Sequence, residues 1–280
     1  TRKAAPVSRQ IVFKDLSEPR TVQIPKAGIY QVDVTLKPPT KISPAADSSM
    51  LQQGLVGAWS LNGDAKSASE AKELAGQIAG GAQFVDSPIG TGGKAISLDG
   101  RDDAVVIPRN PSMDVGKGDF TVAAWIHPTE LRQAGIVCLG RYNLVHGWYL
   151  DMPNNKGVIR IETINPGNQF NGTVSSRPGV IRANTWQHVA VVVRRGENMT
   201  DLYVNGFEVG VGTVQPEALD NPNVALHIGR IQGSHLFKGQ IDEVHFYNRA
   251  LAVEEIHALL EPGKQFVQEP PEPQQELTLK

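Results

Sequence analysis

The sequence predicts an all-β protein, a two-sheet antiparallel β-sandwich of jelly-roll type with a short C-terminal helix. From residue 54 onward a long series of short apolar runs follows, and turn-forming residues separate the runs. No long segment repeats its apolar residues with helical spacing. Glycine accounts for 28 of the 280 residues, which is typical of a chain with many tight turns.

Several runs indicate which of their faces is buried. The run 120–126 (FTVAAWI) places Phe120, Val122, Ala124 and Ile126 on one side of a strand. Residues 186–194 (WQHVAVVVR) are almost continuously β-branched, so we expect a strand that is buried on both faces. Asn205-Gly206 between two runs predicts a hairpin, because a type I′ turn needs positive φ at both central positions.

The remaining runs complete the expected sandwich. Residues 69–81 are rich in alanine and are interpreted as a helical turn or a loop. The other expected strands are residues 55–61, 95–98, 104–107, 135–140, 147–152, 158–163, 202–204, 207–211, 224–228 and 239–247.

The last of these strands, residues 239–247, is expected to be central and to lie beside the first strand. Strict alternation puts Asp242 on the same face as Val244 and Phe246. Burying a carboxylate there is costly unless a cation, N–H donors or a metal ion accompanies it. A helix of a few turns is expected next, ended by Pro262-Gly263.

Composition divides the chain into four parts. Residues 1–36 hold three strand-like runs and form either the tail of a preceding β-domain or strands docked on the main one. Residues 37–53 read as a linker, 54–261 as the sandwich, and 262–280 as a tail rich in Pro, Gln and Glu. The chain has neither an initiator Met nor a signal peptide. It is therefore interpreted as a piece of a longer polypeptide, whose other domains are expected partners.

Charge and cysteine content exclude several functional classes. The formal net charge is -2, so we expect no nucleic-acid partner. No apolar run approaches the thickness of a bilayer, so we expect no membrane insertion. The single cysteine, Cys138, excludes an internal disulfide, and its apolar surroundings predict a buried thiol.

A set of short motifs in a fixed order points to a family. The motifs are residues 54–60 (GLVGAWS), 98–105 (LDGRDDAV), 119–126 (DFTVAAWI), 186–190 (WQHVA), 202–206 (LYVNG) and 239–251 (GQIDEVHFYNRAL). Together they make residues 54–261 resemble the laminin-G-like, concanavalin-A-like lectin/glucanase superfamily, in its bacterial form related to laminin G and pentraxin modules. The resemblance implies two antiparallel sheets and a secreted, periplasmic or cell-surface protein.

The resemblance also implies a non-catalytic module that binds glycans or proteins. Catalytic members carry Glu-x-Asp-x-x-Glu or Glu-x-Asp-x-Glu on one strand, and this sequence has neither motif. Asp102-Asp103 in a turn and Glu254-Glu255 at a helix start are interpreted as solvated charges, and His188 as a core histidine. We therefore expect no catalytic residues.

The resulting hypothesis is a recognition module of a larger protein, with carbohydrate as its ligand. One alternative is a protein-interaction or spacer domain without a glycan ligand. The other is a glycan-active hydrolase with unrecognised carboxylates.

The candidate ligand cluster lies in one loop, residues 140–146 (GRYNLVH). Sugar recognition needs an aromatic face for stacking and polar groups for the hydroxyls. Arg141, Tyr142, Asn143 and His146 supply both kinds of group within six residues. The four tryptophans are expected in the core. Phe170 and Phe237 are further loop aromatics, with folding back onto the sandwich as their alternative role.

The family resemblance further implies a structural calcium ion. It would be held by Asp242, by the carbonyl of Gly100 and by an oxygen of Asn62, where the family usually has Asp. The neutral amide of Asn62 removes one charge and should weaken binding. The alternative is that Asp242 accepts N–H bonds from the turn 99–103 without a metal.

Overall fold

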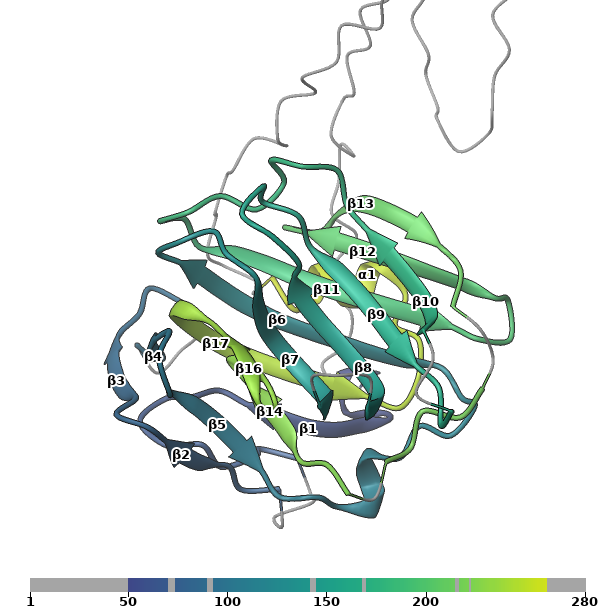
Figure 1. Ribbon diagram of the computed structural model, residues 1–280, viewed down its shortest axis with the longest axis horizontal. Helices are drawn as coiled ribbons and strands as arrows, with labels where there is room; N and C mark the ends of the chain where they lie inside the picture. The colour runs from purple at the N-terminus through teal and green to yellow at the C-terminus, as the bar shows by residue number, and fades with distance from the viewer. Residues whose placement is uncertain are drawn as a thin grey trace, which may run out of the picture. The chain divides into compact units, whose positions relative to one another are not determined.

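The structure is a computed structural model that describes residues 50–260 except 70–73, 90–92, 142–144, 168–169, 215–216 and 222 (Figure 1). The side chains of residues 141, 145, 170 and 171 also lie outside this description. The predicted segments 1–36 and 262–280 and most of the linker 37–53 are outside it, so those boundaries stay predictions. The last linker residues, Met50–Gln52, form the 3-10 helix η1.

Two antiparallel sheets form a sandwich, as predicted. Sheet A has the order β13-β12-β11-β6-β17-β4-β3, and β1 also pairs with β17. Its strands are β1 (Leu55–Trp59), β3 (Gln83–Asp86), β4 (Lys94–Asp99), β6 (Phe120–Pro128), β11 (Gln187–Arg194), β12 (Met199–Val204), β13 (Phe207–Gly212) and β17 (Lys238–Tyr247). The predicted neighbourhood of the first and closing strands is confirmed.

Sheet B has the order β10-β9-β8-β7-β14-β5-β2. Its strands are β2 (Gln77–Ala79), β5 (Ala104–Ile107), β7 (Ala134–Arg141), β8 (Val145–Met152), β9 (Arg160–Ile164), β10 (Phe170–Ser175) and β14 (Leu226–Ile228). A small hairpin of β15 (Arg230–Ile231) and β16 (Ser234–Leu236) follows β14. Among the described residues, no helix has the length and apolar character needed to cross a membrane.

Aromatic side chains from both sheets join the two layers at the centre of the core. Phe120 of β6 and Phe246 of β17 both pack against Trp148 of β8, with ring centroids 5.5 Å and 5.4 Å apart. All three side chains are fully buried. Burying a side chain of this size contributes about 1.5–3 kcal/mol, so this contact adds to the cohesion between the sheets. The face predicted for residues 120–126 is confirmed.

The helix α1 (Val253–Ala258) covers the outer face of sheet A. Ile256 and Leu259 pack there against small residues of β6 and β11 and against Tyr247. Arg249 holds the helix start, because its guanidinium donates to both oxygens of Glu255 at 2.8 and 2.6 Å. The same group donates to the main-chain oxygens of Met50 and Gln53, so it also fixes η1.

A β-bulge in β17 corrects the face predicted for Asp242. The register against β6 shifts between Asp242 and His245, and Glu243 has a φ of 45°. Asp242 therefore pairs with Trp125, whereas Val244 and Phe246 point into the core between the sheets. The prediction that Asp242 shares their face is wrong, because the bulge adds one residue to the alternation.

Other sequence predictions have mixed outcomes. Asn205 and Gly206 both have positive φ, 52° and 80°, which confirms the predicted hairpin turn. Residues 77–79 and 83–86 are strands, where the sequence suggested a helical turn or loop for part of this region. Trp186 precedes β11 and is half-buried, so its predicted core position is wrong. Phe237 is fully buried, which confirms its alternative role.

Replacing Glu255 with alanine should lower the free energy of unfolding by about 2 kcal/mol, because it removes two charge-assisted hydrogen bonds. Urea unfolding measures this loss, and Glu254→Ala on the exposed side of α1 is the control. Hydrogen bonding to Arg249 lowers the pKa of Glu255. The stabilisation is therefore complete above the ordinary glutamate pKa and is lost as the pH falls through the lowered value. Equal losses in both variants would contradict this role.

Candidate ligand-binding site

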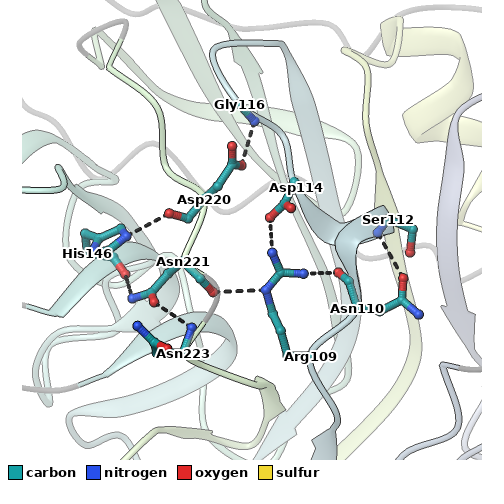
Figure 2. Close-up of polar contacts among 9 residues, drawn as sticks. All are labelled: Arg109, Asn110, Ser112, Asp114, Gly116, His146, Asp220, Asn221 and Asn223. Carbon is teal, nitrogen blue, oxygen red and sulfur yellow. Dashed lines mark hydrogen bonds and ion pairs between the residues drawn. The ribbon is translucent and has the colours of Figure 1, made fainter.

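Three loops meet at one end of sheet B. Leu226, the first residue of β14, pairs with Ile107 at the end of β5 and with Leu139 near the end of β7. The loop after β5, the start of β8 and the loop before β14 are consequently neighbours. We call residues 108–118, 146, 217–221 and 223–225 the loop surface, and Figure 2 shows its polar contacts.

His146 connects the start of β8 to the loop before β14. Its ring Nε2 lies 2.7 Å from the carbonyl oxygen of Asp220. Because a carbonyl oxygen only accepts, Nε2 carries the proton and donates. In return the side-chain amide of Asn221 donates to the carbonyl of His146 at 2.8 Å. Asn221 is 1% exposed, so these bonds lie beneath the surface and fix the two segments together.

Arg109 and Asp220 attach the third loop. The Arg109 Nε donates to the carbonyl of Asn221 at 3.0 Å, and its guanidinium pairs with the carboxylate of Asp114. The Asp220 carboxylate accepts from the main-chain N–H of Gly116 at 2.7 Å. Two independent contacts therefore hold loop 108–118 against loop 217–225 (Figure 2).

The outer layer of the loop surface carries polar side chains that the network positions through the backbone. Ser112 donates its main-chain N–H to the side chain of Asn110 at 2.9 Å. Asn223 donates its own main-chain N–H to the side chain of Asn221 at 3.0 Å. The side chains of Ser112, Asp114 and Asn223 are exposed. Hydroxyl, carboxylate and amide groups are thus presented on a backbone with fixed geometry.

The sequence-based ligand cluster is only partly described. His146 lies in the loop surface, but its ring is half-buried and bonded to Asp220. Arg141 ends β7 opposite Val145, and its side chain is outside the description. Tyr142 and Asn143 lie outside the described residues.

Sequence reasoning missed the partners of His146. The signal was present as two Asn-Pro turns, residues 109–113 (RNPSM) and 220–223 (DNPN). Such dipeptides mark turns and leave polar side chains beside the backbone. Their meeting depends on the order β7-β14-β5, which joins segments more than a hundred residues apart in the chain.

The structure does not bring the three predicted calcium ligands to one place. The register of β4 and β17 places Asp242 beyond Ile96, near Ala95. Gly100 lies five residues further along, roughly 17 Å at the rise of a β-strand. Calcium ligands lie at about 2.3–2.6 Å from the ion, so one ion cannot contact both residues. The prediction that Gly100 binds the same calcium ion as Asp242 is therefore wrong.

Asp242 and Asn62, the other two predicted ligands, both lie beside the first residues of β4. Asp242 is fully buried and accepts from the Ser87 hydroxyl at 2.8 Å and from its neighbouring main-chain N–H at 2.9 Å. The Asn62 amide oxygen accepts from the main-chain N–H of Lys94 at 3.0 Å. The donors to Asp242 are thus not those of the turn 99–103, and the alternative interpretation was wrong in that respect.

The turn 99–103 is held by one of its own carboxylates. Asp103 accepts from the main-chain N–H groups of Gly81 and Asp99, at 2.6 and 2.8 Å. Asp103 is buried, as is Glu255, so the interpretation of both as solvated charges was wrong. Ligand atoms of Asp99, Asp102 and Asp103 lie within 4.8 Å of one another, an arrangement that is common without an ion.

Comparison with protein families gives a match over residues 99–257, more than half of the chain, to the model described as the concanavalin A-like lectin/glucanases superfamily. The chain belongs to the concanavalin A-like lectin/glucanases superfamily. Comparison with curated protein sequences gives no match.

Solved structures with this superfamily fold resemble the chain at low identity. The binding domain of Paraclostridial Mosquitocidal Protein 1 has a TM-score of 0.63 and 19% identity, over 75% of this chain and 52% of that structure. Domain 4 of the Geobacillus stearothermophilus arabinanase AbnA was solved in complex with arabinotriose. It has a TM-score of 0.56 and 20% identity, over 74% of this chain and 98% of that structure. The receptor binding domain of botulinum neurotoxin C/D mosaic serotype has a TM-score of 0.57 and 15% identity, over 74% of this chain and 51% of that structure. The chain spans about half the length of the two toxin structures it matches.

The superfamily includes glucanases, and the catalytic members use a pair of carboxylates on one sheet face. Asp151 of β8 and Glu162 of β9 lie on the outer face of sheet B, and no sequence motif predicts this pair. Arg160 lies between them, donating to both Asp151 oxygens at 2.9 and 2.6 Å and to Glu162 at 2.6 Å. Burial raises the pKa of Asp151 to about 6, with Arg160 opposing the rise, and burial also raises the pKa of Glu162.

Replacing Arg160 with methionine should destabilise the domain by about 3–5 kcal/mol at neutral pH, because two buried carboxylates lose their cation. Both carboxyl pKa values are already raised in the folded chain. The loss should therefore shrink as the pH falls from 7 to 5 and the carboxyl groups bind protons. Urea unfolding at both pH values checks this, with the exposed Arg177→Met as control. A loss that is independent of pH would contradict the assignment.

Proposed function

We propose that this domain is a non-catalytic recognition module that binds carbohydrate through the loop surface. The observation that carries the proposal is the cross-loop network of His146, Asp220, Asn221 and Arg109, which fixes exposed polar groups in advance of binding. Sugar hydroxyls are recognised by convergent planar and hydroxyl groups of this kind. A surface that is already ordered loses less conformational entropy when a ligand binds, and this favours affinity.

The state of the carboxylate pair on sheet B supports a binding role over hydrolysis. A glycosidase needs one carboxyl group as acid and another as nucleophile or base. Here both oxygens of Asp151 accept from Arg160, and one oxygen of Glu162 does the same. Both carboxyl groups are thus engaged by Arg160, so neither is placed to contact a glycosidic bond.

The fold relatives suggest where such a module acts and which sugars to test first. The AbnA domain belongs to an extracellular arabinanase and was solved with arabinotriose. We propose an extracellular or cell-envelope location for the present chain, as one module of a longer polypeptide. Arabino-oligosaccharides are accordingly included in a glycan array that also samples sialylated and β-glucan ligands.

The double substitution Ser112→Ala with Asn223→Ala should weaken glycan binding about tenfold. It removes two exposed polar groups, each worth about 0.5–1.5 kcal/mol, while the network keeps the main-chain N–H groups of both residues. Isothermal titration with the best array ligand measures the affinity. The matched control is Asn155→Ala, an exposed asparagine beyond the opposite end of β8.

An unchanged affinity in the double variant would place the sugar elsewhere on the domain. An array without any hit, together with co-purification of a protein partner, would instead favour the protein-interaction alternative. Turnover of a β-glucan that is lost on mutating Asp151 or Glu162 would overturn the non-catalytic proposal.

A structural calcium ion stays a prediction, now confined to Asp242 and Asn62. An ion bound only by the folded chain raises stability by mass action. If calcium binds at this edge, it should raise the thermal midpoint of the wild-type domain and leave Asp242→Asn unchanged. Differential scanning fluorimetry with calcium or a chelator measures both. A wild-type midpoint that ignores calcium contradicts the prediction, and a shift that survives the substitution places the ion elsewhere.

A further inference from the structure

A row of aromatic and polar side chains crosses the outer face of sheet A. The strand register places Gln240 of β17 between His127 of β6 and Ser97 of β4. Ser97 in turn lies opposite Gln83 of β3, the edge strand. At the other end, the ring centroid of Trp186, just before β11, lies 5.4 Å from that of His127. We call these five residues the sheet A row, and five strands at their usual spacing make it roughly 19 Å long.

The side chains of the row point away from the core. Ile126, Ile241 and Ile96 each adjoin a member of the row in the chain, and all three are buried between the two sheets. Because successive residues of a strand face opposite sides, their neighbours in the row lie on the outer face. Gln83 is exposed and the other four members are half-buried, so each offers some surface to a ligand. None of the five belongs to the loop surface.

The polar groups of the row have no hydrogen-bond partner within the part of the chain that the structure describes. The Nδ1 atom of His127 is buried there without one. The indole N–H of Trp186, the amides of Gln240 and Gln83 and the hydroxyl of Ser97 are in the same state. A half-buried donor or acceptor without a partner costs free energy, and a ligand that pairs with it removes that cost.

The segment that carries Trp186 is held in place by its own hydrogen bonds. The next residue, Gln187, is buried, and its side-chain oxygen accepts from the main-chain N–H of Arg182 at 2.7 Å. The main-chain N–H of Asn184 donates to the carbonyl of Pro128 at the end of β6, also at 2.7 Å. The indole therefore stands on a fixed backbone beside β6, and a ligand that stacks on it orders little more of the chain.

The charge of the row favours a neutral ligand. Its five members include no carboxylate, lysine or arginine. Next to the row, the register sets Lys238 opposite Asp99, so the adjoining charges have opposite signs. Lys238 also forms an ion pair with Glu130, at 3.3 Å. Neither an anion nor a cation thus finds an unopposed charge of the other sign at this row.

We propose that the sheet A row is a second binding site, which takes an extended neutral oligosaccharide. One sugar ring stacks on the indole of Trp186, since aromatic rings offer sugars an apolar face with a polar edge. The hydroxyl groups of the following units bond to Gln240, Ser97 and Gln83. The length of the row selects a chain of several sugar units over a disaccharide. This site does not depend on the loop surface, because the two share no residue.

Titration of the full chain with five neutral hexasaccharides, from cellulose, laminarin, mannan, xylan and arabinan, tests the proposal. Amide and indole chemical shifts report each site separately. At least one hexasaccharide should give saturable shifts at Trp186, Gln240 and Ser97. The disaccharide of the same linkage should bind there about tenfold more weakly, because it cannot span the row.

Two substitutions within the row should weaken this binding. Trp186→Ala should weaken it about tenfold, and Trp186→Phe, which keeps a ring, should lose clearly less. Gln240→Ala should weaken it about fivefold by removing one hydrogen-bonding amide. The matched control is Gln77→Ala, an exposed glutamine on the edge strand β2 of sheet B, which should leave the affinity unchanged.

Gln240→Ala keeps the test decisive if Trp186→Ala fails to fold, because its amide bonds nothing in the described part of the chain. The absence of saturable shifts in the row with all five hexasaccharides would overturn the proposal. Equal affinity for the hexasaccharide and its disaccharide, or unaltered binding in either alanine variant, would do so as well. Shifts confined to the loop surface would overturn this site alone, whereas shifts confined to the row would support it and count against the loop surface.

Discussion

The hydrogen bonding of β17 is the constraint on which the rest of the domain depends. This strand pairs with β6 along one side and shares its other side between β4 and β1. It is the last of the described strands in chain order, and within sheet A it joins β6 on one side to β4 and β1 on the other. Along this other side, β17 pairs with β4 as far as Ile241 and with β1 from Val244 onward. The bulge at Asp242 and Glu243 accommodates the change of neighbour.

This single irregularity has consequences on both faces of sheet A. On the inner face it restores Val244 and Phe246 to the core, where Phe246 meets Trp148 of the other sheet. On the outer face it places Glu243 and His245 in the lining of a small cavity that residues of η1 and β1 and Leu259 also line. The buried Asp242 carboxylate accepts hydrogen bonds from the Ser87 hydroxyl and from a main-chain N–H. These bonds replace water around its charge.

The sequence was sufficient for the elements whose patterns are regular. Strand β6 and the Asn205-Gly206 turn follow directly from side-chain alternation and from the need for positive φ. The bulge escaped prediction because a residue inserted into a strand leaves the apolar pattern superficially intact. The strands β2 and β3 escaped because edge strands of three or four residues, with few apolar side chains, resemble loops.

The candidate site was less predictable than the fold, for a topological reason. His146 was recognised, but its partners Asp220 and Asn221 approach only because β14 lies between β5 and β7. Many of the bonds there also involve main-chain groups, which carry no mark in the sequence. The pair Asp151 and Glu162 has no motif in the sequence, because the two carboxylates lie on neighbouring strands, with Asp151 opposite Arg160 and Glu162 opposite Tyr149.

Mapping amide chemical shifts in the presence of a bound glycan is the most direct test of the central claim, that the loop surface is the recognition site. The account predicts the largest shifts at Ser112, Asp114, Gly116 and Asn223, with little change on the outer face of sheet B. Shifts concentrated around Tyr149, Glu162 and Thr173, with an unperturbed loop surface, would contradict it.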